Sequence, residues 1–319
     1  MAHLKRDFKK DVYGGVIGHA VGDALGVPVE FVNRITLDRN PVDRMTGYGT
    51  HHMPPGTWSD DTSMSIALMQ SIIDCSGIDY DDIMRKFLEW SQYSRFTATG
   101  ETFDIGGTCA ISISNYIGGT DPLDCGETGE RSNGNGSLMR ILPIAYACYG
   151  RSLKDEKKYQ LVSDVSSLTH AHEISILGCY IYVNFVCHLL AGDKPIEAYN
   201  KTCKDDYSRF SEEVRAAYLR ILAGEMTKLD KDDISSKGYA ISTLEAALWC
   251  LLTTKSYKDA VLKAVNLGGD TDTIGAVTGS MAGIFYGYNA IPKEWLNELK
   301  KHEYLLRLCN GFAGTVKKT

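Results

Sequence analysis

The stretch Asn266-Leu267-Gly268-Gly269-Asp270-Thr271-Asp272-Thr273-Ile274-Gly275 places two aspartates two residues apart, directly after a pair of glycines. A run of small and apolar residues follows it, to about Gly287. Aspartate and threonine favour the first turn of a helix, where their oxygens accept hydrogen bonds from free N–H groups. The same oxygens suit a hard cation such as Mg²⁺ or Mn²⁺, and glycines let the backbone fold tightly around an ion. The stretch alone fits either a helix cap or a metal site.

A second acidic cluster at residues 56–62, with the sequence Gly-Thr-Trp-Ser-Asp-Asp-Thr, precedes another apolar helical run. Burying several carboxylates without compensation is costly, so the two clusters either stay at the surface or bind cations. Two metal ions about 3.5–4 Å apart would suit this ligand set. Two unrelated helix caps remain the alternative interpretation.

Two predicted helices have glycines at a regular spacing. The sequence of residues 8–26 predicts a helix in which glycine recurs every four residues. Glycine also recurs every four residues in the run that follows Asp270 and Asp272. Such stripes let two helices approach closely. We expect two buried helices that cross each other or a shared neighbour near the site. The two stripes are Gly14, Gly18, Gly22 and Gly26, and Gly275, Gly279, Gly283 and Gly287.

The segment from Val29 to Trp58 has no periodicity and is rich in proline and glycine. Loops of this length in a compact chain are usually functional or disordered, and we interpret this one as a lid over the site. Glu30 begins the segment and is a candidate metal ligand or general base.

Two further polar motifs lie in the middle of the chain. Ser132 precedes the consecutive pairs Asn133-Gly134 and Asn135-Gly136, which fit either a plain loop or a cradle of N–H groups for an anion such as phosphate. Thr169-His170-Ala171-His172 contains an H-x-H pair, which suits capping or packing as well as metal binding.

Composition restricts the class of protein. The 319 residues, 44% of them hydrophobic, can bury a substantial core. The net charge of -6 argues against a general electrostatic attraction to nucleic acid. The nine cysteines are odd in number and form no C-x-x-C, so they indicate reduced thiols rather than a disulfide framework or a zinc site.

No segment of the sequence matches the ~20 consecutive apolar residues of a membrane helix, and His19 and Asp23 interrupt the N-terminal apolar run. We therefore expect a cytoplasmic protein without a membrane segment. Only short fragments alternate with period two, which predicts an all-α fold: a compact, single-domain bundle of about a dozen helices over residues 1–319, with the metal site at helix starts. Helices are predicted at residues 8–26, 79–93, 102–117, 138–148, 174–190, 240–252 and 256–265.

Taken together, these motifs resemble the ADP-ribosylglycohydrolase family. Its motifs occur here in the family's order and span nearly the whole chain: Gly22-Asp23-Ala24-Leu25-Gly26 with Glu30, residues 56–62, residues 135–140 with Pro143, Thr169-His170, and residues 266–273. The family often has threonine before the paired aspartates, where this chain has Ser59, which keeps the hydroxyl.

The resemblance implies an orthogonal all-α fold with two bound ions, Mg²⁺ or Mn²⁺. It assigns metal contacts to Ser59, Asp60, Asp61, Asp270, Asp272 and Thr273. It places Glu30 on a mobile segment beside the metals, with catalytic roles for Glu30, Asp60, Asp61 and Asp272. It assigns binding of the ADP-ribose to Gly106, Gly107, Ser132, Asn133, Gly134, Asn135, Gly136 and His170.

The activity implied is hydrolysis of the glycosidic bond between ADP-ribose and a modified protein side chain or other acceptor, with ADP-ribose as the product. An ADP-ribose-binding or metal-binding protein without catalysis and a different metal-dependent phosphoester hydrolase are the alternatives. The sequence leaves open the acceptor linkage, the choice between Mg²⁺ and Mn²⁺, the oligomeric state and the identity of the general base.

Overall fold

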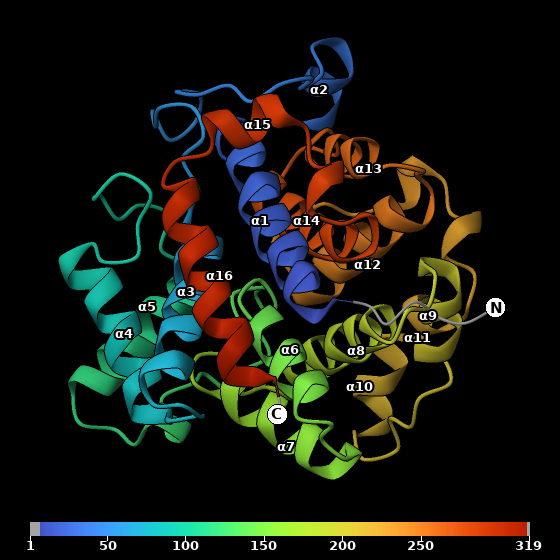
Figure 1. The fold of residues 1–319 in the computed structure, drawn as a ribbon. Helices are drawn as coiled ribbons and strands as arrows, with labels where there is room; N and C mark the ends of the chain where they lie inside the picture. The colour runs from blue at the N-terminus through green and yellow to red at the C-terminus, as the bar shows by residue number, and fades with distance from the viewer. Residues whose placement is uncertain (1–6, 318–319) are drawn as a thin grey trace.

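The computed structural model describes residues 7–317, and this part of the chain contains helices and no strands. The all-α prediction is confirmed, with sixteen α-helices instead of about a dozen (Figure 1). The α-helices are α1 (Phe8–Gly26), α2 (Arg34–Arg39), α3 (Asp60–Asp74), α4 (Tyr80–Tyr93), α5 (Gly107–Ile117), α6 (Leu142–Gly150), α7 (Asp155–Ser167), α8 (Glu173–Leu190), α9 (Pro195–Thr202), α10 (Glu212–Ala217), α11 (Leu219–Leu222), α12 (Ala240–Leu252), α13 (Tyr257–Val265), α14 (Thr271–Tyr286), α15 (Lys293–Glu298) and α16 (His302–Val316). Five short 3₁₀ turns join them: η1 (Val27–Val29), η2 (Pro122–Asp124), η3 (Met226–Lys228), η4 (Lys231–Asp233) and η5 (Tyr288–Ala290).

Helices α1 and α14 lie side by side in the centre of the molecule, in contact through their glycines (Figure 1). A Cβ atom on Gly18 would lie 2.4 Å from the carbonyl oxygen of Gly279, and one on Gly22 would lie 2.0 Å from that of Gly275. Along the contact, residue numbers increase in α1 and decrease in α14, so the two helices are antiparallel. The glycine stripes therefore pack against each other, as expected.

The antiparallel pairing brings the end of α1 to the start of α14. A Cβ atom on Gly26 would lie 2.3 Å from the Cα atom of Asp272, so side chains next to these residues meet at one end of the pair. Gly287 does not join the contact, because it ends α14 with a φ of 84° and has no atom within 4 Å of a Cβ position.

Helix α8 departs from our expectation that no segment is long and apolar enough to be a membrane helix. Its 18 residues, with a mean hydropathy of 1.5, are long and apolar enough to cross a membrane by length and composition. However, 78% of them are buried against the rest of the protein, which is also typical of a core helix. His172 caps this helix by accepting a hydrogen bond from the backbone N–H of Ile174 at 3.2 Å.

The helix starts near the predicted site differ from the sequence prediction at two places. Helix α5 begins at Gly107, five residues later than expected, because Asp104 has a φ of 53°, which a right-handed helix does not contain. Helix α6 begins at Leu142 instead of residue 138, with Pro143 in its first turn, where the missing proline N–H is tolerated. The loop at residues 132–136 is therefore separated from α6 by a turn and does not lie directly at its N-terminus.

Candidate metal centre and substrate pocket

The start of α3 is held by a carboxylate from α1. Oδ1 of Asp23 accepts a hydrogen bond from the backbone N–H of Ser59 at 2.8 Å. Its Oδ2 accepts from the backbone N–H of Thr62 at 3.0 Å and from the Thr62 hydroxyl at 2.6 Å. Ser59 is the N-cap and accepts from the N–H of Asp61 at 3.3 Å. Asp23 thereby fixes the position of the paired aspartates, a role that we did not assign from the sequence.

The two acidic clusters meet through a direct contact between α3 and α14. The Thr273 hydroxyl donates a hydrogen bond to Oδ1 of Asp61 at 3.2 Å. Asp272 accepts at its Oδ1 from the backbone N–H of Thr273 at 3.0 Å. Residues 212 positions apart in the chain thus form one site at the end of the α1–α14 pair.

Carboxylate oxygens form two groups that share Asp272. One group joins Asp272 with Asp23 and Asp61, and the other joins it with Glu30 and Asp270. Within each group the oxygens lie within 4.8 Å of one another. This spacing brings together Glu30 and three of the aspartates that the resemblance implicates, Asp61, Asp270 and Asp272.

Burial raises the pKa of every carboxyl group in this cluster, because desolvation disfavours the charged form. The pKa of Asp23 and that of Glu30 rise to about 7. The pKa values of Asp60, Asp61 and Asp272 rise well above the ordinary range through burial first and repulsion from neighbouring carboxylates second. A positive charge close to these carboxyl groups would therefore stabilise their ionised forms.

The donor set fits a divalent cation. Among residues 7–317, no lysine or arginine forms an ion pair with these carboxylates. Oδ2 of Asp61 is fully buried and has no hydrogen-bond partner in this part of the chain. A buried carboxylate oxygen without a partner, among hydroxyl and carboxylate oxygens, is the environment that Mg²⁺ or Mn²⁺ satisfies.

A pocket of about 260 Å³ opens beside the cluster. Its walls include many of the residues predicted for metal or substrate: Glu30, Asp60, Gly106, Gly107, Gly134, Asn135, Gly136, His170, Asp270 and Thr273. Ser59, Asp61 and Asp272 lie behind this wall and are almost wholly buried. Residues predicted for metal and residues predicted for substrate therefore lie around one pocket, and their roles stay a prediction.

Ser132 and Asn133 are the predicted substrate residues that do not line the pocket. Asn133 is buried, and its side chain accepts a hydrogen bond from Ser175 at 2.9 Å and donates one to the carbonyl of Glu130 at 3.0 Å. Its own carbonyl accepts from the N–H of Ala240 at 3.1 Å. These bonds fix the shape of the loop, and direct contacts of Ser132 and Asn133 with substrate stay a prediction.

Asn135 joins the loop to the carboxylate cluster. Its Nδ2 donates to Oδ2 of Asp270 at 2.7 Å and to the Thr243 hydroxyl at 2.9 Å. Asn135 thus orients a candidate metal ligand, and a substrate held by the loop would lie next to the metal centre.

His170 forms the opposite side of the pocket in its neutral form. It is buried, with Nδ1 2.9 Å from the Thr169 hydroxyl. Burial, followed by repulsion from the buried Arg140 guanidinium, lowers the pKa of His170 to about 3. A Cβ atom on Gly136 would lie 2.7 Å from Cε1 of His170, so this position requires glycine.

Glu30 has two neighbours that our sequence analysis did not include. Its Oε2 contacts Nε2 of His51 in a short hydrogen bond, and these two groups lie near a carboxylate oxygen of Asp104. The ring of His51 also packs on Phe103, with 5.2 Å between ring centroids. No periodic pattern surrounds His51, so the sequence offered no means of placing it at the site. Asp104 could have been placed there, because it precedes the glycine pair Gly106-Gly107, which was predicted to line the pocket.

The comparisons with known proteins agree with this fold. The family model described as ADP-ribosylglycohydrolase matches residues 4–319, and the chain therefore belongs to this family. The family resemblance seen in the motifs is confirmed.

Relatives at moderate identity align along most of the chain. "ADP-ribosylarginine hydrolase Tri1" of Serratia proteamaculans (strain 568) is 33% identical, with 93% of this chain and 77% of the relative covered. "ADP-ribosyl-[dinitrogen reductase] glycohydrolase" of Rhodospirillum rubrum is 31% identical, with 90% and 89% covered. A solved structure titled "ADP-ribosylglycohydrolase-related protein complex" superimposes with a TM-score of 0.81 at 29% identity, covering 97% of this chain and 99% of that one.

Proposed function

We propose that this protein is a metal-dependent hydrolase that cleaves the glycosidic bond between ADP-ribose and a modified protein side chain or another acceptor, and releases ADP-ribose. Residues 1–319 would form one ADP-ribosylglycohydrolase-like domain. The observation that supports this proposal most directly is the bond from Asn135 to Asp270, because it places the loop assigned to the ADP-ribose against the carboxylate cluster.

The proposed cofactor is Mg²⁺ or Mn²⁺, as two ions. Ser59, Asp60, Asp61, Asp270, Asp272 and Thr273 would hold them. When bound, such ions lower the pKa of water and polarise the oxygens of a sugar.

Glu30 is the proposed proton carrier. Its Oε2 contacts His51, and its carboxyl group lines the pocket, where it would take a proton from the attacking water or give one to the leaving group. A pKa of about 7, raised by burial, suits a group that both accepts and donates a proton near neutral pH. The pocket wall formed by Gly134, Gly136 and neutral His170 would hold the ADP-ribose and exclude bulk water from the anomeric carbon.

Arginine is the proposed first acceptor. Two relatives, 33% and 29% identical, are named ADP-ribosylarginine hydrolases. The pocket wall also carries the carboxyl groups of Glu30 and Asp104, which would attract a guanidinium cation. An ADP-ribosylated protein is therefore the proposed partner. The nine cysteines, all free, support a reducing, cytoplasmic location.

The test is a panel of arginine-linked, serine-linked and nucleic-acid-linked ADP-ribose substrates, each incubated with Mg²⁺, Mn²⁺ or EDTA. Free ADP-ribose would be measured by mass spectrometry, with the Asp60→Asn protein as the control for contaminating activity. We expect release from the arginine-linked substrate with metal and none with EDTA.

Two other outcomes favour the alternative functions. Failure to cleave any substrate, with ADP-ribose still bound in calorimetry, would identify a binding protein without catalysis. Release of phosphate or of a nucleotide in place of ADP-ribose would identify a phosphoester hydrolase.

A further inference from the structure

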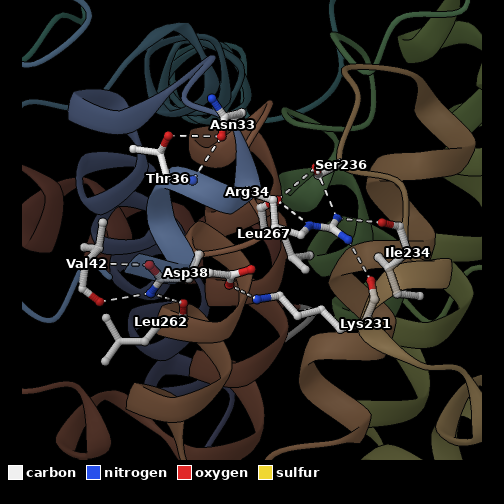
Figure 2. A network of polar contacts seen from close by, with 11 residues as sticks. Asn33, Arg34, Thr36, Asp38, Val42, Lys231, Ile234, Ser236, Leu262 and Leu267 are labelled. Carbon is white, nitrogen blue, oxygen red and sulfur yellow. Dashed lines mark hydrogen bonds and ion pairs between the residues drawn. The ribbon is translucent and has the colours of Figure 1, made fainter. Parts of the chain in front are cut away.

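The segment that follows Glu30 is hydrogen-bonded to two loops in the C-terminal third of the sequence. Asn33 caps the short helix α2 through its side-chain oxygen, which accepts from the N–H and the hydroxyl of Thr36, both at 3.0 Å. Arg34 is the first residue of α2, and its side chain leaves the helix towards the loops at residues 231–236 and 266–270 (Figure 2).

The guanidinium of Arg34 bridges both loops through uncharged acceptors. Its Nε donates to the carbonyl of Leu267 at 2.8 Å. Its Nη1 donates to the carbonyl of Lys231 at 2.7 Å, and its Nη2 to that of Ile234 at 2.6 Å (Figure 2). Nη2 also lies 3.4 Å from the Ser236 hydroxyl. A planar, permanently charged fork can satisfy carbonyls in several directions at once, which a lysine ammonium cannot do with the same geometry.

Two of the bridged segments continue directly into site residues. The N–H of Phe31 donates to the carbonyl of Gly269 at 2.7 Å, and the N–H of Gly269 donates to the carbonyl of Val32 at 2.9 Å. Phe31 follows Glu30, and Gly269 precedes Asp270. This reciprocal pair of backbone bonds therefore lies within two residues of Glu30 and one residue of Asp270, and Arg34 lies beside it.

The packing around this contact leaves little room for movement. Gly268 has a φ of 71°, and a Cβ atom there would lie 2.6 Å from the backbone nitrogen of Arg34. The N–H of Asp270 donates to the carbonyl of Ser236 at 2.9 Å, so the loop at 231–236 also holds the backbone of Asp270, a candidate metal ligand.

A second fastening holds the far end of the same segment. The Asn266 side chain accepts from the N–H of Val42 at 2.8 Å and donates to its carbonyl at 2.9 Å (Figure 2). Residues 31–42 are thus fixed at both ends, which restricts the lid that we expected over residues 29–58. Opening of the site would involve the part between Val42 and Trp58, which includes His51.

We propose that Arg34 is a positioning residue that holds the Glu30 turn against the Asp270 loop and so sets the distance between these two carboxylates. It is not among the residues that line the pocket, and it acts through backbone carbonyls. The inference rests on the proposed function only for its kinetic readout, because metal binding and backbone exchange report on it independently.

The experiment compares Arg34→Ala and Arg34→Lys with Arg220→Ala. Arg220 is the control, since it also donates to a carbonyl of the 231–236 loop, that of Asp233, and its Nε pairs with Glu245 at 2.8 Å. Within residues 7–317, no hydrogen bond or ion pair joins it to residues 31–42. Hydrogen exchange would be followed in peptides covering residues 29–34 and 267–272, and Mn²⁺ affinity would be measured by calorimetry.

We expect Arg34→Ala to speed exchange in both peptides and to weaken Mn²⁺ binding by about 10-fold, as removal of outer groups around metal ligands does. With an arginine-linked substrate, kcat should fall more than KM rises, because Glu30 is displaced while the far wall of the pocket is intact. Arg34→Lys should lie between Arg34→Ala and the wild type, and it replaces Arg34→Ala if that protein does not fold.

The proposal would be overturned by unchanged exchange in both peptides, by wild-type Mn²⁺ affinity in Arg34→Ala, or by an equal effect of Arg220→Ala. If the wild type cleaves no substrate while Arg34→Ala still loosens both peptides, the proposed function fails and the positioning role stands. If the wild type is active and Arg34→Ala matches it in every measurement, the positioning role fails alone.

Discussion

Gly22 of α1 and Gly275 of α14 face each other so closely that neither can carry a side chain. A Cβ atom on Gly22 would lie 2.0 Å from the carbonyl oxygen of Gly275, and one on Gly275 would lie 2.5 Å from the carbonyl oxygen of Gly22. The contact is one residue from Asp23, which caps α3, and three residues from Asp272. The backbone approach of two helices therefore sets the positions of both acidic clusters.

The first prediction is that Gly22→Ala separates these helices. Because the new methyl group would meet backbone atoms, the helices must shift, and overpacking of this kind costs about 1–3 kcal/mol or more. The free energy of unfolding, measured with urea, should fall by at least that amount, and Mg²⁺ affinity should fall with it.

The matched control for this prediction is Gly314→Ala in α16, where a Cβ atom would have no neighbour within 4 Å. Alanine in an open helical position should stabilise the protein by up to about 1 kcal/mol. Equal stability changes in the two variants would show that the α1–α14 contact does not have the tightness described.

The second prediction concerns Asp272, which both carboxylate groups share. Asp272→Asn keeps the shape and removes a buried carboxyl group whose charged form is disfavoured by burial and by its neighbours, so the metal-free protein should be as stable as the wild type or more stable. Metal affinity and turnover should each fall by at least about 100-fold, the upper end of the effect of outer groups on metal sites. Asp232→Asn removes the same charge from an exposed position and should change neither property. Wild-type Mg²⁺ affinity in Asp272→Asn would show that the metal is held elsewhere.

The third prediction is that stabilisation by Mg²⁺ increases with pH. The pKa values of Asp23 and Glu30 rise to about 7 through burial, so without metal the folded state binds more protons than the unfolded chain below that pH. This contribution to stability is fully present below the ordinary carboxyl pKa and is lost as pH rises through 7. Metal binding requires the deprotonated groups, so its effect has the opposite dependence.

The rise in Tm produced by saturating Mg²⁺ should therefore be larger at pH 8 than at pH 5.5. His19 and His170 oppose the carboxyl groups, because burial lowers their pKa values to about 4 and about 3, and their contribution is lost as pH falls. Neither histidine is a candidate metal ligand, so we expect their contribution to cancel in the difference. A Tm increment independent of pH would show that metal binding is not coupled to deprotonation of Asp23 and Glu30.

The fourth prediction separates two neighbouring glycines of the pocket loop. A Cβ atom on Gly136 would lie 2.7 Å from Cε1 of His170 and 2.9 Å from Sγ of Cys109, whereas one on Gly134 would come no closer than 3.6 Å to any atom. Gly136→Ala should therefore displace His170 and weaken ADP-ribose binding in calorimetry by about 10-fold or more, which is the effect of ~1.4 kcal/mol. Gly134→Ala should leave His170 in place and lose less affinity than Gly136→Ala, and a similar loss in both would contradict the assignment of the close contact.

Several features of this protein follow from local sequence. The run of residues 8–26 has the composition and spacing of a helix, and α1 spans these same residues, as α12 spans residues 240–252. Helix-capping preferences also placed the acidic clusters at the starts of α3 and α14. The Ser59 side chain caps α3, whereas Asp270 stands at the N-cap of α14 without a capping side-chain hydrogen bond. Motif order was enough to identify the family.

Tertiary structure alone decided how these elements meet. The four-residue glycine spacing predicts a close helix contact, but only the folded chain shows that Gly22 pairs with Gly275 in an antiparallel arrangement. The role of Asp23 as a cap for α3, the contact of His51 with Glu30 and the bridge formed by Arg34 join segments that lie far from one another in sequence. Periodicity reports which face of a helix is buried, whereas side-chain partners across the chain depend on how the buried faces pack together.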